Sequence, residues 1–211
     1  MPEPLIPPHG GYKKLVTYRL GNLIYDATVA FCERYIDHRD RTFDQMIQAA
    51  RSGVANIIEG SEASATSKKT ELKLTNVAKA SHEEVLADYQ AFLRQRNLPE
   101  WPPDSPPAVT VRRSRPGDLA QLRQLMASLV SDLSDRSDRS DRSDRSDRSD
   151  RSDKAALLAT VAANTMICLV NQETFLLKRQ IDRLAEDFES EGGFSERLYR
   201  VRKTARSDEE K

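Results

Sequence analysis

One segment of this sequence, from Phe43 to Glu71, constrains the fold more strongly than any other. Its apolar side chains recur every three or four residues, which is the spacing of one face of an α-helix. Gly60 is expected to end that helix as a left-handed C-cap, and Ser61–Thr66 should form a turn before a second helix that starts near Ser67. Helices joined by so short a turn should lie antiparallel. The apolar stripe of the first helix consists of Phe43, Met46, Ile47, Ala50, Val54, Ile57 and Ile58.

Apolar stripes of the same kind predict the other long helices. One is expected from Tyr12 to about Asp37, the second helix of the hairpin should end before Pro99, and another is expected from about Lys154 to Glu189. No window alternates convincingly between apolar and polar residues, so the chain is predicted to be all-α. We expect an antiparallel up-down four-helix bundle with additional short helices. The stripe of the last long helix is expected to be Leu158, Val161, Thr165, Cys168, Gln172, Phe175, Leu176 and Arg179.

The segments outside these helices differ from them in composition. Six prolines between residues 97 and 116 exclude a helix interior, so we expect a surface connection there, anchored by Trp101. The triplet Ser-Asp-Arg repeats six times from Ser134 to Arg151. Charges cancel within every triplet, and a three-residue period cannot hold one face of a helix with 3.6 residues per turn. The repeat is therefore predicted to be a disordered or weakly helical spacer.

These features divide the chain into seven expected segments. Gly192-Gly193 should stop the last long helix, and Ser195 should cap a final, basic one. In chain order they are a flexible tail at 1–11, bundle helices one to three at 12–96, the proline-rich connection at 97–116, a short helix at 117–133, the spacer at 134–153, the fourth bundle helix at 154–190, and the basic helix and tail at 191–211.

Charge and cysteine content narrow the range of functions. The 33 basic and 33 acidic side chains cancel, so any binding to nucleic acid must use a local patch rather than a global field. No signal-peptide pattern opens the sequence and no membrane span is predicted, so we expect a cytoplasmic protein with no membrane partner. Cys32 and Cys168 lack a CxxC spacing and are expected to be reduced core residues.

One candidate nucleic-acid site is a basic stripe on the second helix of the hairpin. Between its first and last lysine only Glu71 opposes the positive charge. Such a stripe can neutralise phosphates, but it lacks the side chains that read base edges, so any binding should be independent of sequence. The alternative is an ordinary solvated face. The stripe consists of Lys68, Lys69, Lys73 and Lys79.

The other basic candidate is the C-terminal helix, which carries Arg197, Arg200, Arg202, Lys203 and Arg206 with no acid among them. It could contact nucleic acid. Alternatively, its apolar side chains could dock on the bundle while its arginines pair with neighbouring glutamates. Those apolar residues are Phe194, Leu198 and Tyr199, and the glutamates are Glu186, Glu189 and Glu191.

Enzymatic and metal chemistry are not expected from this sequence. A di-iron bundle needs two Glu-x-x-His pairs, and His82-Glu83-Glu84-Val85 is followed by Leu86 rather than the His of a metalloprotease motif. Asn56 and Glu59 are expected to satisfy backbone groups near the turn or to pair with Lys68 or Lys69. No cofactor is predicted. A lesser alternative is an all-α nucleotide hydrolase, whose acidic spacing Glu59, Glu62, Glu84 and Asp88 do not match.

The pattern Gln45-Met46-x-x-Ala49-Ala50-x-Ser52-x-x-x-Asn56-Ile57-x-Glu59-Gly60 resembles the bacterial four-helix-bundle proteins encoded by intervening sequences in 23S rRNA genes. Ser67-Lys68, Leu74, Ala78, Ala80-Ser81 and Glu84 continue the likeness, and residues 191–200 resemble the C-terminal suffix of one subgroup. The accessory protein of diversity-generating retroelements is a relative of that family. The resemblance implies a small bundle that often forms pentamers and, in the retroelement branch, binds nucleic acid.

We therefore expect a non-enzymatic, self-associating bundle that binds RNA or DNA without sequence specificity. The alternative is a structural bundle that binds another protein and has no role with nucleic acid.

Overall fold

The protein is described by a computed structural model, which covers residues 10–138 and 147–209. Within these residues every regular element is a helix, so the all-α prediction is confirmed. The elements are a 3₁₀ turn η1 (Tyr12–Lys14), α1 (Val16–Tyr35), α2 (Arg41–Ala63), α3 (Lys68–Gln95), α4 (Pro106–Ser114), α5 (Leu119–Asp138), α6 (Asp147–Glu191) and α7 (Phe194–Glu209).

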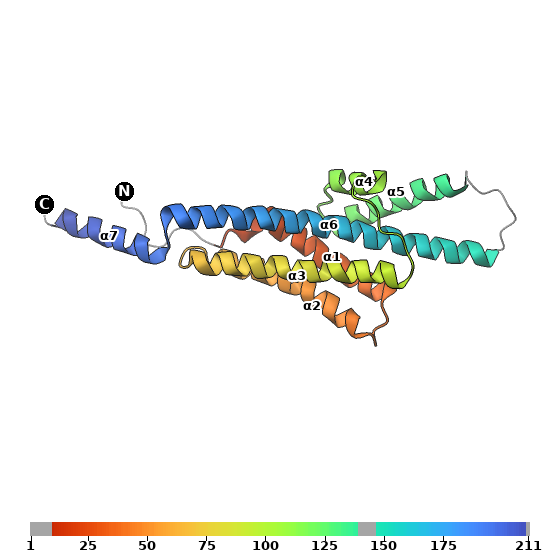
Figure 1. Cartoon of the computed structure of the whole chain (residues 1–211), viewed down its shortest axis with the longest axis horizontal. Coiled ribbons are helices and arrows are strands. Elements are labelled where there is room, and N and C mark those ends of the chain that lie inside the picture. Colours follow the sequence, from red (N-terminus) through yellow and green to blue (C-terminus); the bar gives the residue numbers. More distant parts are fainter. Residues whose placement is uncertain (1–9, 139–146, 210–211) are drawn as a thin grey trace.

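Helices α1, α2, α3 and α6 form the main body and lie side by side along its length (Figure 1). Around this body α1 contacts α2, α2 contacts α3, α3 contacts α6, and α6 contacts α1. The shorter α4 and α5 cover one flank of α6, and α7 extends beyond the end of the body (Figure 1). The described residues thus form more helices than the sequence predicted, because the proline-rich connection contains α4.

The interior holds one large apolar cluster, with an aromatic group near the end of α1, and a smaller cluster of Ile57, Ala78 and Leu177. Phe31 contacts the rings of Tyr89 and Phe92 edge-on, each with centroids 4.8 Å apart. Such pairs contribute about 0.5–1.5 kcal/mol beyond the area they bury. The hydroxyl of Tyr89, which is fully buried, donates to Thr28 Oγ1 at 3.0 Å. This bond satisfies the polar group in the core and joins α1 to α3.

Helix α3 begins near Ser67 as predicted, but α2 does not end where predicted. Asp40 caps α2 by accepting from the Thr42 N–H at 2.9 Å, and Ser67 caps α3 by accepting from the Thr70 N–H at 3.1 Å. The prediction that Gly60 ends α2 is wrong, because α2 continues to Ala63. Gly60 lies buried inside the helix against α3, where a Cβ atom would meet Leu74 Cβ at 3.4 Å.

Helix α4 corrects the expectation of an irregular connection at 97–116. Its two prolines, Pro106 and Pro107, occupy the first turn, where a missing N–H removes no helical hydrogen bond. Trp101 anchors the connection as expected. Its N–H donates to Asn164 Oδ1 on α6 at 2.7 Å, and the Asn164 amide donates to the Pro99 carbonyl at 2.9 Å.

Both helices that flank the Ser-Asp-Arg repeat extend into it. Helix α5 continues into it as far as Asp138, and α6 begins at Asp147, before the predicted start at Lys154. Residues 139–146 of the expected spacer, like the expected tail at 1–9, lie outside the described residues. Gly192, with φ 75°, ends α6 as predicted. The prediction that Ser195 caps the last helix is wrong, because α7 begins at Phe194.

Helix α6 contains the one stretch among the described residues that is long and apolar enough to cross a membrane. Length and composition alone therefore do not exclude a span. Inside the protein 61% of that stretch is buried, as in the central helix of a packed core.

Candidate functional site

The centre of the body holds a buried contact between His82 of α3 and Glu173 of α6. The imidazole Nδ1 contacts Oε2 of the carboxylate, and both side chains are 0% exposed. The other polar atoms of the pair, His82 Nε2 and Glu173 Oε1, have no hydrogen-bond partner among the described residues. Removing either partner of such a buried pair strongly destabilises the folded protein, because the polar group of the other partner is left buried without compensation.

Two glycines on the opposite helices make room for this pair. A Cβ atom on Gly53 of α2 would lie 1.9 Å from His82 Cδ2 and Nε2, and one on Gly21 of α1 would lie 2.7 Å from Glu173 Oε1. Each helix of the body therefore contributes one residue to the centre: Gly21, Gly53, His82 and Glu173. We name these residues the central quartet.

Burial determines the electrostatics of the central quartet. It raises the pKa of Glu173 above the ordinary range, and attraction to His82 opposes that rise as the smaller effect. Neither side chain reaches solvent, so neither can exchange a proton with a bound substrate. The geometry supports a structural role, in which the pair fixes the position of α3 against α6.

Sequence reasoning missed the central quartet. His82 was considered only as part of a metal motif. The stripe predicted for α6 is buried at Val161 and Thr165 but leaves the buried face further along, where Phe175 is 60% exposed while Leu169, Glu173 and Leu177 are fully buried. The available signal was the spacing of these three, since residues four apart share a helix face. A charged residue between two leucines at this spacing indicates a buried carboxylate with a partner.

The residues of the family-like motif have structural contacts. The Asn56 amide donates to the Ser52 carbonyl at 2.8 Å, and the Ser52 hydroxyl lies 3.1 Å from that of Ser81 on α3. Glu59 is exposed. It is Glu71 that contacts Lys68, at 3.6 Å.

The predicted lysine stripe is divided in the structure. Lys68 pairs with Glu71 and Lys79 pairs with Glu83, while Lys69 and Lys73 are exposed. Two of the four positive charges are therefore partly neutralised within α3.

The structure brings the start of α3 and the basic helix α7 to the same end of the molecule (Figure 1). Burial raises the pKa of Glu71 there, and repulsion from the Asp187 carboxylate adds to that rise. The Gly10 N–H donates to the Ser61 carbonyl at 3.3 Å, and this bond holds η1 at that end. Acidic residues are mixed with the basic ones, and the highest density of positive charge is on α7. We name the following set the basic end: Lys13, Lys14, Lys69, Lys73, Arg197, Arg200, Arg202 and Lys203.

Of the apolar side chains expected to dock in the alternative for α7, Tyr199 is 69% exposed, whereas Phe194 and Leu198 are half-buried. The acid in the first turn of α7, Glu196, accepts a hydrogen bond from the Gly193 N–H at 2.9 Å. That carboxylate therefore caps the helix.

Both cysteines are free thiols, and their burial predicts low reactivity. Burial raises the pKa of Cys32 to about 12 and that of Cys168 to about 11, and only the thiolate is a nucleophile. At about pH 8, where an ordinary thiol with a pKa of about 8.5 reacts readily, we expect iodoacetamide to label neither cysteine of the folded protein. Both should be labelled in guanidinium. Rapid labelling of the native protein, detected by mass spectrometry, would show that the thiols are accessible.

Among the described residues no group of three or more His, Cys, Asp or Glu side chains could hold a metal ion. No protein-family model, curated protein or solved structure matches this chain.

Proposed function

We propose that this protein is a non-catalytic, self-associating four-helix-bundle protein that binds nucleic acid without reading its sequence. In this proposal α1, α2, α3 and α6 are the up-down bundle of the intervening-sequence family that the Asn56–Gly60 motif resembles. Helices α4 and α5 are additions to that bundle, and α7 corresponds to the suffix.

The observation that carries the nucleic-acid proposal is the position of α7. This helix extends past the body (Figure 1), so phosphates can approach it without meeting the rest of the protein. Between Phe194 and Lys203 it has four basic residues and one acid. Lysine and arginine that contact phosphates release condensed counterions, which supplies affinity independent of base sequence.

Neutralising α7 tests this proposal. The variant Arg200→Gln/Arg202→Gln/Lys203→Gln is expected to weaken binding to duplex DNA and structured RNA and to reduce the salt slope by about 2.7, since each lost phosphate contact removes about 0.9. Mobility-shift titrations at several salt concentrations measure both effects. The matched control, Arg39→Gln/Arg41→Gln/Arg94→Gln, removes the same charge from exposed positions on other segments. Equal losses in both variants would show that α7 is not the site.

Self-association is supported by Phe175, which is 60% exposed on the face of α6 opposite the core. We expect Phe175→Ser to lower the mass of the assembly measured by light scattering, because an exposed aromatic ring is typical of the centre of an interface. Phe188→Ser, at a position on α6 that is 39% exposed, serves as a comparison. An unchanged mass for Phe175→Ser would place the interface elsewhere.

A further inference from the structure

An open groove lies between α1, α5 and α6, away from the basic end. Its volume is about 560 Å³, within the range of about 300–1,000 Å³ that small-molecule sites occupy. Helix α5 packs mainly against α6 and only weakly against α1, which leaves the groove open between α5 and α1. The walls are mostly apolar. The lining side chains that are partly open to solvent include Leu119, Met126, Val130 and Leu158, whereas Leu122 and Met166 are fully buried.

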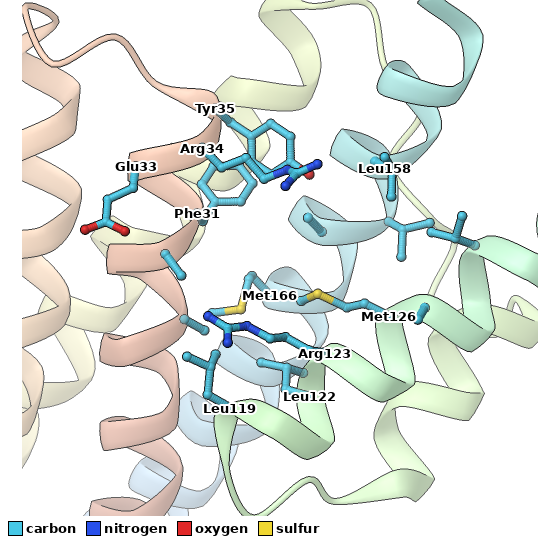
Figure 2. Close-up of a pocket in the computed structure, with 16 residues that line it drawn as sticks. Phe31, Glu33, Arg34, Tyr35, Leu119, Leu122, Arg123, Met126, Leu158 and Met166 are labelled. Atoms are coloured by element: carbon cyan, nitrogen blue, oxygen red, sulfur yellow. The ribbon is translucent and has the colours of Figure 1, made fainter. Parts of the chain in front are cut away.

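Two positive charges accompany this apolar surface. Figure 2 shows the guanidinium groups of Arg34 and Arg123 directed into the space between the helices, and Glu33 directed away on the other side of α1. Arg34 lies over the Tyr35 ring, 5.5 Å from its centroid. In the described part of the chain neither guanidinium forms an ion pair with a carboxylate. An apolar wall beside two uncompensated cations is complementary to an apolar molecule with an anionic head.

The size of the groove favours a single aliphatic chain over a partner helix. An α-helix about 10 Å wide, rising 1.5 Å per residue, fills roughly 120 Å³ per residue. The groove would hold little more than one turn of it. An extended hydrocarbon chain, in contrast, gains about 0.8 kcal/mol for every methylene group it buries, and guanidinium groups bind carboxylates through paired N–H donors.

We propose that this groove binds a single-chain aliphatic carboxylate, the class to which fatty-acid anions belong. Its aliphatic chain lies along Leu119, Met126 and Leu158, and its carboxylate is attracted by the positive charges of Arg34 and Arg123. The site is separate from the basic end and does not depend on nucleic-acid binding.

Calorimetric titration of the full chain with decanoate tests this proposal. Saturable binding is expected, weaker by tenfold or more for decanol, and absent for decyltrimethylammonium, whose head is repelled. Arg34→Gln/Arg123→Gln should weaken decanoate binding by tenfold or more, whereas Arg94→Gln/Arg113→Gln, at exposed positions outside the groove, should not.

A filled groove provides an independent check. Ala127→Trp enlarges an exposed lining residue and should abolish decanoate binding while the thermal midpoint and the mass of the assembly stay unchanged. Unaltered binding in this variant, equal binding of all three probes, or no saturable binding would overturn the proposal. A smaller assembly with unaltered binding would overturn it as well and would identify the groove as an interface between copies.

Discussion

Replacing Gly53 by alanine is expected to destabilise the protein by roughly 3 kcal/mol or more, the combined scale of overpacking a core and disturbing a buried ion pair. On propensity alone the substitution should help, since alanine in a helix interior is better than glycine by about 1 kcal/mol. The added Cβ atom, however, would lie 1.9 Å from the ring of His82. That ring is fully buried and held by Glu173, so it cannot move aside without breaking the pair.

Gly60→Ala is the matched control, because Gly60 lies in the same helix and is also buried. Its Cβ would meet Leu74 Cβ at 3.4 Å, which is an ordinary contact. We expect this variant to be between neutral and about 1 kcal/mol more stable than the parent. Urea unfolding followed by circular dichroism measures both. Similar midpoints for the two variants would contradict the geometry of the central quartet.

A partial rescue distinguishes a clash with His82 from a general intolerance at position 53. The double variant Gly53→Ala/His82→Ala removes the ring that the new methyl group meets. Its destabilisation should be less than the sum of those of the single variants, with a coupling of about 0.5–3 kcal/mol, as found for residues in contact. Strict additivity would mean that position 53 does not act through His82.

The second large effect is expected from breaking the ion pair. Glu173→Ala and His82→Ala should each lower the free energy of unfolding by about 3–5 kcal/mol, because each leaves its partner buried and uncompensated. The double variant His82→Leu/Glu173→Leu should lose less than either single one, since no buried charge remains. A double variant that loses the sum of the two would show that the residues act independently.

The pair also predicts how stability depends on pH. Burial raises the pKa of Glu173 above its ordinary value of 4.5, so the folded protein retains a proton that the unfolded chain releases. The stability from this group is complete below the unfolded pKa and is lost as the pH rises through the folded one. Relative to Glu173→Gln, the free energy of unfolding of the parent should therefore fall as the pH rises above the ordinary value of 4.5. A difference that is constant or increases would contradict the direction of the shift.

Local signals predicted most of the helices, the start of α3 near Ser67 and the end of α6 at Gly192. In the structure the side chains of Asp40 and Ser67 cap α2 and α3 by accepting from the backbone N–H groups that follow. Gly60 was assigned incorrectly because a glycine that ends a helix and a glycine that packs against a neighbouring helix look alike in sequence. The first turn of α4 shows the converse, since prolines that exclude a helix interior are compatible with its start.

The residues of the candidate site were harder to predict than the helices, because their positions depend on tertiary structure. From Ala159 to Val170 nearly every side chain of α6 is buried, so its apolar pattern does not identify one inner face. The predicted stripe therefore passed through Phe175 instead of Glu173. The pairing of Glu173 with His82 requires the packing of α6 on α3, and the basic end requires the topology that brings η1, α3 and α7 together. Neither is encoded in local spacing.

The salt dependence of nucleic-acid binding tests the central functional proposal most directly. If the four basic residues of α7 between Arg197 and Lys203 contact phosphates, a plot of log affinity against log salt concentration for the full chain and duplex DNA should have a slope of about −3.6. Duplexes of unrelated sequence should give the same slope. A slope near zero, or an affinity that depends on the base sequence, would contradict binding through the basic end.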